Sequence, residues 1–547
     1  MSHNYDVILN GCGPVGGIAS LLLATRGFKV AVIDLNKSPY PHPRAVGLNG
    51  YSMSIIENVL KDSWKEFQFT SAVEVGYVMG ITKMDKPFGK MEPPIIEGKV
   101  LDLDKYGFLN WFNQPQLEKL LRIQIKKNKN ITTYFGTESL VLWEEKSRNC
   151  LQIQKTASGK TETITSKYLI GADGGGSFVR KQMGANLKIL GKAISFLVVD
   201  IEAPATSLKE GMHFDAGGWQ IIDPSGKRPT TFINMTGKKH GTYKNNFRFE
   251  FALKDGENFT QMQSPDSIEK LVEPFLKKNS FKILRSTVYK FNSMISEMWR
   301  ANNTFTIGDA THQTSPFLGQ GLNLGIRNTF NLIKKIDLVN KGVSKASILD
   351  KYQVECFPDS QFIIKQSLFM GNMLFNVKPH INFLRSIIYF FKGARGSPID
   401  LFPAFVPETI TVPNGFKPGK TNQKGYPMYN FMTKEGFPRS LREYKPFEYR
   451  VLCNNSSVEI DKVLKNIDKA IKPLCIVLSE GLNGEKTSDD ILVCAPRKQD
   501  KKMHRKLFNK ADYVLMAPGY TMLGTYNNGE ENKLFADYKS LFDLVAH

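Results

Sequence analysis

Cysteine is scarce in this sequence, and the spacing of the six residues present excludes two kinds of centre. No two cysteines form a CxxC pair, so thiol–disulfide exchange is not expected, and none show the spacing of a zinc site. Most of them lie in apolar, strand-like runs. This pattern is typical of buried free thiols in a reducing compartment, and it predicts a cytoplasmic protein without a metal site.

Long apolar runs are also missing. A helix needs about 18–20 predominantly apolar residues to cross a bilayer, and no segment of the sequence reaches that length. The N-terminal residues MSHNYDVILNG enter a strand without the charged region and cleavage site of a secretory signal. We therefore predict no transmembrane segment, while peripheral contact with a membrane stays open.

Negative charge is in deficit, because 73 Lys and Arg residues face 52 Asp and Glu residues, a net charge of +21. Such an excess of positive charge can indicate binding to nucleic acid, to an anionic membrane or to an anionic substrate. The basic residues are scattered, and no basic stripe is interleaved with exposed aromatic residues. A lysine-rich solvated surface with no nucleic-acid partner is the simpler interpretation.

A glycine-rich turn near the N-terminus carries the first motif. A short apolar strand at 5–10 leads into GCGPVG, an apolar helix follows, and a second strand ends in Asp34. In such a unit Gly11 makes the turn, Gly13 lets a pyrophosphate approach, and Gly16 lets the helix pack on the strand. A carboxylate at Asp34 can accept both hydroxyls of an adenosine ribose. The pattern predicts a dinucleotide site but does not distinguish FAD from NAD.

The stretch 304–330 has a related design. A buried strand ends at Gly308-Asp309, a loop with Ser315-Pro316 follows, and Gly319-Gln320-Gly321 precedes an apolar helix. Glycines let backbone approach a ligand, and a helix N-terminus offers free N–H groups and partial positive charge. These features predict a site for a polar, anionic ligand. Taken alone, the stretch is equally consistent with ordinary turn glycines.

A third strand-to-helix turn, GADGGGSFVR at 171–180, completes the set. A GxGxxG turn with a terminal acid, a DG turn and a GD turn in this order resemble the class A flavoprotein monooxygenases. These are single-component, FAD-dependent aromatic hydroxylases. Segments such as SFLVVD at 195–200 and FRFEF at 247–251 resemble the hydroxyphenylpropionate and phenol-ring hydroxylase branch. In the second segment, alternation places Phe249 on one side of a strand and Arg248 and Glu250 on the other.

The resemblance implies an α/β fold: a Rossmann-like FAD-binding domain with an inserted antiparallel β-sheet substrate domain and a degenerate thioredoxin-like C-terminal domain. The length alone favours two or three domains. The expected domains are 1–186 and 291–400 for FAD (with a small β segment near 70–105 that faces the substrate domain), 187–290 for substrate, 401–445 as linker and 446–547 as the thioredoxin-like tail. Without a CxxC pair, the tail is interpreted as a packing or dimerisation module, so a homodimer stays open.

The resemblance also assigns FAD contacts. It implies that glycines of the first turn contact the pyrophosphate and that Asp34 binds the ribose. Arg44 and Gln114 are expected near the flavin, and the DG motif near FAD and NAD(P)H. Asp309 is expected at the ribityl arm, and free backbone N–H groups at the flavin pyrimidine. The full set is Gly11, Gly13, Gly16, Asp34, Arg44, Gln114, Asp173, Gly174, Arg180, Gly308, Asp309, Gly319, Gly321, Leu322 and Asn323.

The implied reaction hydroxylates a phenol, which may carry a carboxylate, with NAD(P)H as cosubstrate and O2 as oxidant through a flavin C4a-hydroperoxide. His312 and Pro316 are the expected catalytic residues, in a wall between flavin and substrate. Family members usually carry Ala and Pro where this chain has Thr311 and Ser315. A general base is not assigned. The candidates are His213, His240, His312, Tyr243 and Tyr289.

Other functions are compatible with the same motifs. One is hydroxylation of a larger polycyclic or polyketide aromatic. Another is an NAD-dependent dehydrogenase in which only the first motif is functional, although the DG and GD turns disfavour it. The last is a non-enzymatic FAD-binding protein, which would bind FAD yet fail to oxidise NAD(P)H with any phenol.

Overall fold

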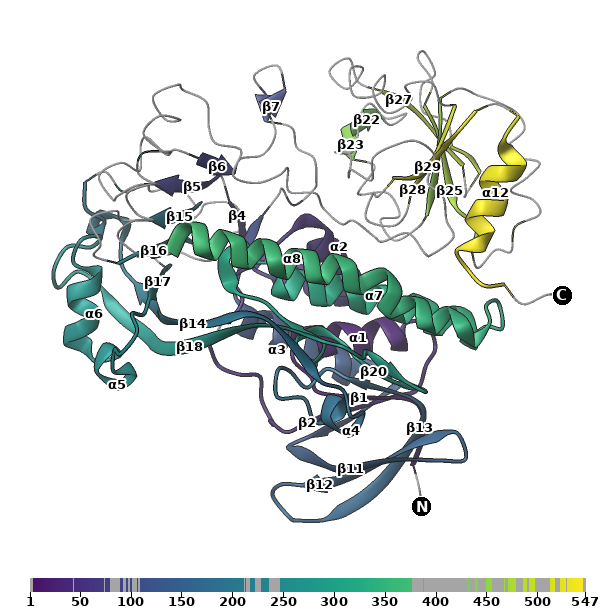
Figure 1. The fold of residues 1–547 in the computed structure, drawn as a ribbon, viewed down its shortest axis with the longest axis horizontal. Coiled ribbons are helices and arrows are strands. Elements are labelled where there is room, and N and C mark those ends of the chain that lie inside the picture. The colour runs from purple at the N-terminus through teal and green to yellow at the C-terminus, as the bar shows by residue number, and fades with distance from the viewer. Residues whose placement is uncertain are drawn as a thin grey trace.

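The computed structural model combines a parallel sheet, two further large sheets and a layer of helices, which confirms the predicted α/β class (Figure 1). The structure describes residues 3–42, 44–72, 74–78, 89–91, 95–96, 99–100, 106, 109–210, 212, 217–221, 228–235, 246–375, 387, 430–432, 438–440, 449–454, 467, 471–478, 486–488, 491–496, 512–516, 522–527 and 529–544.

The N-terminal strand β1 (His3–Asn10) lies inside the first sheet, because its apolar residues are buried on both faces. It pairs in parallel with β2 (Val30–Asp34) and β13 (Thr161–Gly171). The sheet also contains β10 (Ile131–Phe135), β11 (Thr137–Glu145), β12 (Arg148–Lys155), β19 (Arg300–Ala301) and β20 (Thr304–Thr306). Because β20 pairs in parallel with β13, the carboxyl ends of β1, β2, β13 and β20 share one edge, here named the motif edge.

Helices cover one face of this sheet. Val7 and Leu9 of β1 pack in the same core as α1 (Pro14–Ala24), while Ile8 faces a core shared with β12. The long helices α7 and α8 run side by side across the molecule (Figure 1). The remaining helical elements here are α2 (Gly50–Leu60), η1 (Lys61–Glu66), α3 (Gln114–Lys127), α4 (Phe178–Gln182), η4 (Gly308–Ala310), η5 (Pro316–Leu318), α7 (Gly321–Asn340), η6 (Ala346–Asp350) and α8 (Lys351–Phe375).

A second sheet takes most of its strands from the segment between β13 and β20. Its long strands β14 (Leu187–Glu202) and β18 (Lys282–Ser296) pair antiparallel and run away from the first sheet (Figure 1). The other strands are β5 (Glu74–Val78), β6 (Gly89–Met91), β15 (Gly217–Ile221), β16 (Thr230–Asn234), β17 (Asn246–Ala252) and β21 (His312–Gln313). Small elements nearby are β3 (Gly47–Leu48), β4 (Phe69–Ser71), β7 (Ile95–Ile96), β8 (Lys99–Val100), β9 (Asn110–Phe112), η3 (Ala205–Ser207), α5 (Phe259–Met262) and α6 (Pro265–Val272).

The two faces of the inserted sheet differ in composition. On the outer face, Phe247, Phe249 and Phe251 pack with residues of α6, so the predicted alternation along β17 is confirmed. The opposite face, here named the inner face, carries Arg248 and Glu250 together with apolar residues such as Phe196. Phe317 of η5 belongs to the same cluster as Phe196, so the inner face is turned toward the loop that follows β20.

The C-terminal region forms a third sheet with strand order β23-β22-β27-β25-β24-β28-β29. Two short strands, β22 and β23, lie within the range predicted as a linker and pair with each other, and β22 also pairs with β27. The thioredoxin-like assignment stays a prediction. The elements are β22 (Asn430–Met432), β23 (Pro438–Ser440), β24 (Arg450–Cys453), β25 (Leu474–Leu478), β26 (Lys486–Ser488), β27 (Ile491–Pro496), β28 (Tyr513–Met516), β29 (Met522–Tyr526) and α12 (Glu531–Ser540).

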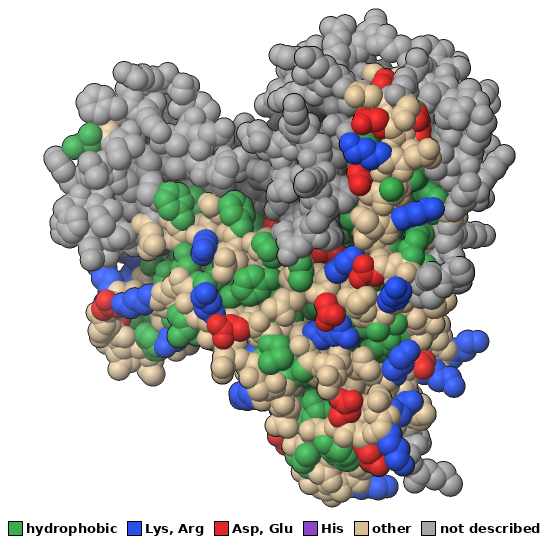
Figure 2. All heavy atoms as spheres, turned by 45° about the vertical axis from the view of Figure 1, so that its right-hand side comes forward, with side chains coloured by type: hydrophobic (Ala, Val, Ile, Leu, Met, Phe, Trp, Pro, Cys, Tyr) green, Lys and Arg blue, Asp and Glu red, His purple; other side chains and the backbone are tan. Residues whose placement is uncertain are grey.

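Several predictions from composition can be compared with the described residues. Five cysteines there, Cys12, Cys150, Cys356, Cys453 and Cys475, are free and buried, as predicted. Within the ranges given above, no His, Cys, Asp and Glu side chains gather into a group that could hold a metal ion. No helix in the same ranges has the length and apolarity needed to cross a bilayer. Lys and Arg side chains are interspersed with Asp and Glu over the coloured part of the face in Figure 2.

Candidate functional site

The three glycine-containing turns predicted from the sequence meet at the motif edge. The Ala172 N–H group, in the DG turn, donates a 2.7 Å hydrogen bond to the carbonyl of Asn10 at the end of β1. The Ile307 N–H group, before the GD turn, donates a 2.9 Å bond to the carbonyl of Gly171. Each turn is thus bonded to its neighbour, and the structure brings the three motifs together as expected.

The glycines of the first turn are required for different reasons. Gly11 has φ +103°, and a Cβ added there would lie 2.4 Å from the carbonyl oxygen of Ala172. A Cβ on Gly16 would lie 2.1 Å from the carbonyl oxygen of Gly11. A Cβ on Gly13 would meet no protein atom within 4 Å. Gly11 and Gly16 are therefore fixed by the fold, whereas the free space at Gly13 is available to a ligand.

Two helices begin side by side at this edge without a side-chain cap. α1 starts after Gly13 and α7 after Gln320, and neither residue forms a capping hydrogen bond through a side chain. Added Cβ atoms on Gly308 and Gly325 would lie 3.3 and 3.1 Å from the side chain of Val15, so the first turn of α1 packs closely on α7 and the GD turn. Paired helix N-termini with free N–H groups favour an anionic ligand.

The loop before α7 is held by Asn323. Its side chain donates a 2.9 Å hydrogen bond to the carbonyl of Gly319, which has φ +61°, and accepts a 3.0 Å bond from the N–H group of Asn49. Asn323 itself is buried, so its side chain serves the loop. The N–H groups of Gly321 and Leu322 lie in the first helical turn, where no intrahelical acceptor exists.

Asp34 is fixed at the end of β2. Its Oδ2 accepts a 2.7 Å hydrogen bond from the N–H group of Cys12 in the glycine turn, and its Oδ1 accepts one of 2.7 Å from Asn36. The Arg122 guanidinium lies 3.6 Å from Oδ1. Each carboxylate oxygen can accept a second hydrogen bond, so the predicted contact with ribose hydroxyls stays open to this residue.

Asp309 is the aspartate of the GD turn. Its side chain is exposed, and loss of hydration next to the protein raises its pKa above the usual value, with a smaller opposing effect of Arg44. Arg44 is exposed, and its guanidinium carbon lies 4.9 Å from the centre of the Tyr40 ring. An accessible carboxylate at this edge is suited to accept a hydrogen bond from a ligand hydroxyl.

Gln114 positions the loop that carries Arg44. Its Oε1 accepts hydrogen bonds from the N–H groups of Arg44 at 3.2 Å and Ala45 at 2.8 Å. Its Nε2 donates a 2.8 Å bond to Glu118, whose pKa is raised by burial. The helix α3 is capped by the neighbouring Asn113, and not by Gln114.

The DG turn is held by its own aspartate. Asp173 accepts 3.0 Å hydrogen bonds from the Asn10 side chain and from the N–H group of Val179, and a 2.5 Å bond from the Ser177 hydroxyl. Gly174 follows with φ +77°, a conformation that favours glycine. In this structure Asp173 therefore organises the start of α4.

Arg180 connects this turn to the GD turn. It is buried, and its guanidinium donates hydrogen bonds to the carbonyls of Gly175 at 2.8 Å and Ala310 at 2.9 Å. The Arg180 guanidinium thus holds the DG turn and the GD turn together through these two hydrogen bonds.

The two predicted catalytic residues lie in different settings. His312 is 1% exposed, accepts a 3.1 Å hydrogen bond from the Asn328 side chain at Nε2, and packs 5.8 Å from the Trp299 ring. Burial lowers its pKa to about 4, so the ring is neutral at pH 7. Pro316 opens η5, and its neighbour Phe317 packs against the inner face.

Among the other general-base candidates, His213, His240 and Tyr243 lie outside the described residues. Tyr289 lies on the inner-face side of β18, and its buried hydroxyl has no hydrogen-bond partner among the described residues. The alternation along β17 predicts Glu250 on the face opposite the phenylalanines, without a role. A charged residue inside an alternating aromatic strand was the available signal.

A pocket lies between the inserted sheet and the loop that carries Arg44, with a volume of about 190 Å³. His42 lines it from the loop, and Asn246 and Arg285 line it from the sheet. Arg285 Nη1 lies 3.5 Å from Asp200, which accepts two shorter hydrogen bonds from Arg248, of 2.7 and 3.0 Å. Two arginines therefore share one carboxylate beside this pocket, here named the loop pocket.

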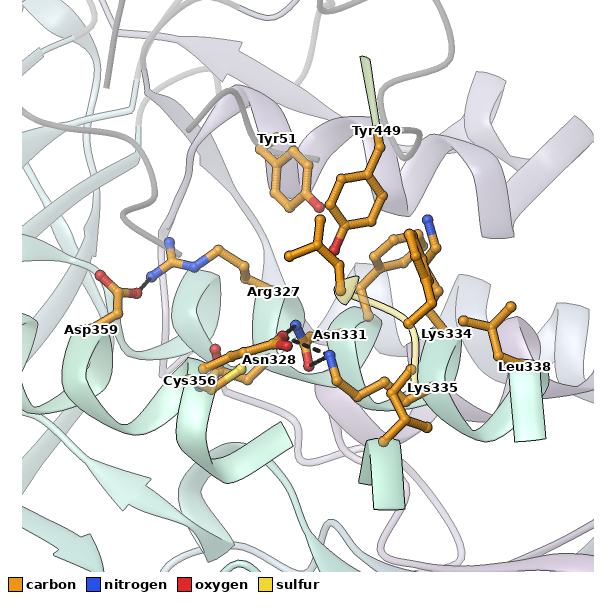
Figure 3. Close-up of a pocket in the computed structure, with 15 residues that line it drawn as sticks. Tyr51, Arg327, Asn328, Asn331, Lys334, Lys335, Leu338, Cys356, Asp359 and Tyr449 are labelled. Carbon is orange, nitrogen blue, oxygen red and sulfur yellow. Dashed lines mark hydrogen bonds and ion pairs between the residues drawn. The ribbon is translucent and has the colours of Figure 1, made fainter. Parts of the chain in front are cut away.

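Figure 3 shows a different pocket between α7, α8 and the C-terminal region. There Lys335 Nζ donates hydrogen bonds to Glu355 at 2.6 Å and Asn331 at 2.9 Å, and Arg327 pairs with Asp359. These acidic and basic side chains form ion pairs with one another. The pocket is thus interpreted as part of the packing between the helices and the C-terminal region.

Comparisons with known proteins agree with the geometry. The chain is 28% identical over 387 residues to the 3-(3-hydroxy-phenyl)propionate/3-hydroxycinnamic acid hydroxylases of Escherichia coli O139:H28 and Shigella sonnei. The match covers 68% of this chain and 63% of the relatives, so the matched region spans less than two thirds of their length.

Two solved structures have the same fold. The flavin-dependent monooxygenase PieE, solved with FAD and substrate, has a TM-score of 0.71 at 16% identity, covering 98% of this chain and 99% of that one. Aklavinone-11 hydroxylase, solved with FAD and aklavinone, has a TM-score of 0.71 at 16% identity, covering 99% of this chain and 100% of the other.

The residues at the motif edge fit FAD. A dinucleotide carries a pyrophosphate, which the open space at Gly13 and the two uncapped helix N-termini would accept, and ribose and ribityl hydroxyls, which Asp34 and Asp309 could bind. Residues 4–367 match the family model described as FAD binding domain. The chain belongs to this family of FAD-binding proteins.

Proposed function

We propose that this protein is an FAD-dependent monooxygenase that uses NAD(P)H and O2 to hydroxylate a phenolic aromatic substrate. The observation that carries the proposal is the contact between Phe317, in the loop after the GD turn, and Phe196 of the inner face, whose ring centroids lie 5.8 Å apart. This contact supports the proposal, because it joins the loop after the GD turn to an apolar surface suited to an aromatic ring. Bound FAD would supply the redox chemistry, because it can accept electrons from NAD(P)H and pass them to O2.

The protein's own residues would position the substrate and exclude water. Val198, Ile233 and Met370 are buried in the same cluster as Phe196 and Phe317, so the expected substrate site has an apolar lining. Exclusion of water protects reactive oxygen chemistry and strengthens nearby electrostatic interactions. The uncapped N-terminus of α7 would favour negative charge on the reduced cofactor by about 1 kcal/mol.

A carboxylate on the substrate is part of the proposal. The matched relatives are named for hydroxyphenylpropionate and hydroxycinnamic acid, which both carry one. Arg285 lines the loop pocket, and Arg248 lies beside it, with the Asp200 carboxylate between the two guanidinium groups. An anionic side chain entering this pocket would be attracted to Arg285.

The roles of single residues are proposals as well. We assign Gly13 to the pyrophosphate and Asp309 to the ribityl arm, with Gln114 and Arg180 positioning the surrounding loops. His312 supports the loop through Asn328, and Pro316 shapes the wall beside the substrate. The domain boundaries near 187 and 291, the cytoplasmic location and a homodimer through the C-terminal region belong to the same proposal.

The test uses purified holoprotein in air with NADH or NADPH. Phenols, with 3-(3-hydroxyphenyl)propionate among them, are screened for faster cofactor oxidation and for a hydroxylated product. We expect a carboxylate-bearing phenol to stimulate both. Stimulation by polycyclic aromatics alone would favour the larger-substrate alternative. Bound FAD without cofactor oxidation for any phenol would contradict the proposed function.

A further inference from the structure

Glu250 occupies the middle of the inner face. On β17 it pairs with Val198 of β14 on one side and Thr231 of β16 on the other, so it lies away from the sheet edges. Its neighbours along the strand, Phe249 and Phe251, point to the outer face. The Glu250 side chain therefore projects toward the apolar cluster that Phe317 completes, and it remains partly accessible.

The carboxylate of Glu250 has no dedicated partner. Of the residues the structure describes, none donates a hydrogen bond to it or forms an ion pair with it. Arg248, two positions earlier on the same face, directs its guanidinium to Asp200 and to the carbonyl of Arg44. A carboxylate in an apolar setting is costly unless it is paired or protonated, so an unpaired one beside a substrate site indicates a proton-binding role.

The groups that face Glu250 can be named for each neighbouring strand. The charged groups nearest to Glu250 are Arg248 on β17 and Asp200 on β14. The uncharged Thr231, whose hydroxyl donates to Gln220, lies beside it on β16. One strand beyond β14, Thr287 of β18 shares its cross-strand row, and Arg285 and Tyr289 lie two positions to either side. Burial raises the pKa of Glu250, Arg248 lowers it and Asp200 raises it further. A general base works best when its pKa is near the operating pH, and a raised carboxylate pKa moves in that direction.

We propose that Glu250 contacts the aromatic hydroxyl of the substrate and accepts its proton, an inference that rests on the proposed function. The phenol O–H bond breaks, an O–H bond forms on a carboxylate oxygen of Glu250, and the electron pair stays on the phenolate oxygen. No oxidant or reductant takes part in this step. The phenolate then has increased electron density at the ring positions ortho and para to its oxygen, where hydroxylation would occur.

The competing acceptors are less suited. His312 is held by Asn328 and Trp299, and its lowered pKa makes it a weak base. Tyr289 has an unpartnered hydroxyl on the same side of the sheet, but a phenol hydroxyl is protonated at neutral pH and can only relay a proton. Glu250 can accept a proton directly.

The test compares Glu250→Gln, Glu250→Asp and Tyr289→Phe with wild type as FAD-loaded holoproteins. Glu202→Gln is a matched control, because Glu202 is an exposed carboxylate at the end of β14. Hydroxylation of 3-(3-hydroxyphenyl)propionate is measured from pH 6 to 10. Glu250→Gln should retain FAD and lose about 100-fold in kcat near pH 7. The loss should shrink as the pH approaches about 10, where the phenol ionises unaided. Glu250→Asp should recover part of the rate and Glu202→Gln should match wild type.

A second readout is the ultraviolet difference spectrum of bound substrate. Wild type should show the phenolate band well below the pKa of the free phenol, and Glu250→Gln should not. A wild-type rate and pH profile in Glu250→Gln, or a pH-dependent loss confined to Tyr289→Phe, would overturn the role of Glu250. Wild-type holoprotein that forms no hydroxylated product from any phenol would instead overturn the proposed function, and this inference with it.

Discussion

The Arg180 side chain donates a 2.9 Å hydrogen bond to the carbonyl oxygen of Ala310. The two residues belong to different motifs, because Arg180 follows the DG turn and Ala310 ends the GD turn. The same guanidinium also binds the carbonyl of Gly175. One buried cation thus sets the distance between two turns that are 130 residues apart in the sequence.

Replacing Arg180 with Met should loosen this link. The change leaves two buried carbonyls without their donor, and we expect a loss of about 1–3 kcal/mol in the free energy of unfolding. FAD affinity should fall about tenfold or more because the turns no longer hold their spacing. Fluorescence titration with FAD measures the affinity, and Lys181→Met, at an exposed neighbouring position, is the control. Equal FAD affinity in both variants would refute the positioning role.

The glycines of the first turn should separate folding from cofactor binding. Gly16→Ala places a Cβ 2.1 Å from a backbone oxygen and should destabilise the apoprotein. Gly13→Ala meets no protein atom, so the apoprotein should keep its Tm while FAD affinity falls by about tenfold or more. Gly176→Ala, also in open space, is the control. Unchanged FAD binding by Gly13→Ala would show that the pyrophosphate lies elsewhere.

His312 should affect acid stability more than the pH dependence of catalysis. Burial, assisted by Arg327, lowers its pKa from 6.5 to about 4 in the folded protein. Between these values the unfolded chain binds more protons than the folded one, so stability is complete above pH 6.5 and falls as the pH drops toward 4. The full shift corresponds to about 3 kcal/mol. The fall in Tm from pH 7 to 4.5 should be smaller for His312→Gln than for wild type, and an identical fall would contradict this assignment.

Arg285 should distinguish substrates by their side chains. If it attracts a carboxylate in the loop pocket, Arg285→Gln should lower kcat/KM for 3-(3-hydroxyphenyl)propionate by about 10- to 100-fold. A neutral phenol such as 3-propylphenol should lose much less. FAD content is measured for each preparation, because Arg285 also lies 3.5 Å from Asp200. Equal losses for the two phenols would indicate a structural role alone.

The sequence predicts local geometry well at positions where a single physical constraint determines the residue type. Gly11 and Gly16 are required by clashes with nearby backbone, and the alternation along β17 follows from strand geometry. Partners distant in the chain were not predictable in this way. Nothing in the spacing shows that Arg180 binds the carbonyl of Ala310, or that Gln114 holds the Arg44 loop.

The substrate side of the site was harder to predict. Alternation separates Glu250 from the phenylalanines but does not show which face meets α6 and which meets Phe317. That choice depends on how the inserted sheet packs on the first one. The position of His312 within a motif predicts a catalytic role, whereas in the structure its ring contacts Asn328 and Trp299.

The central claim is that the FAD-binding edge and the inner face together hydroxylate a phenol with oxygen from O2. Holoprotein, NAD(P)H and 3-(3-hydroxyphenyl)propionate are incubated under ¹⁸O₂, and the product is examined by mass spectrometry. The account predicts a hydroxylated product that carries one ¹⁸O atom, formed only when both the phenol and NAD(P)H are present. Oxidation of NAD(P)H with hydrogen peroxide as the sole product, for this and every other phenol tested, would contradict it.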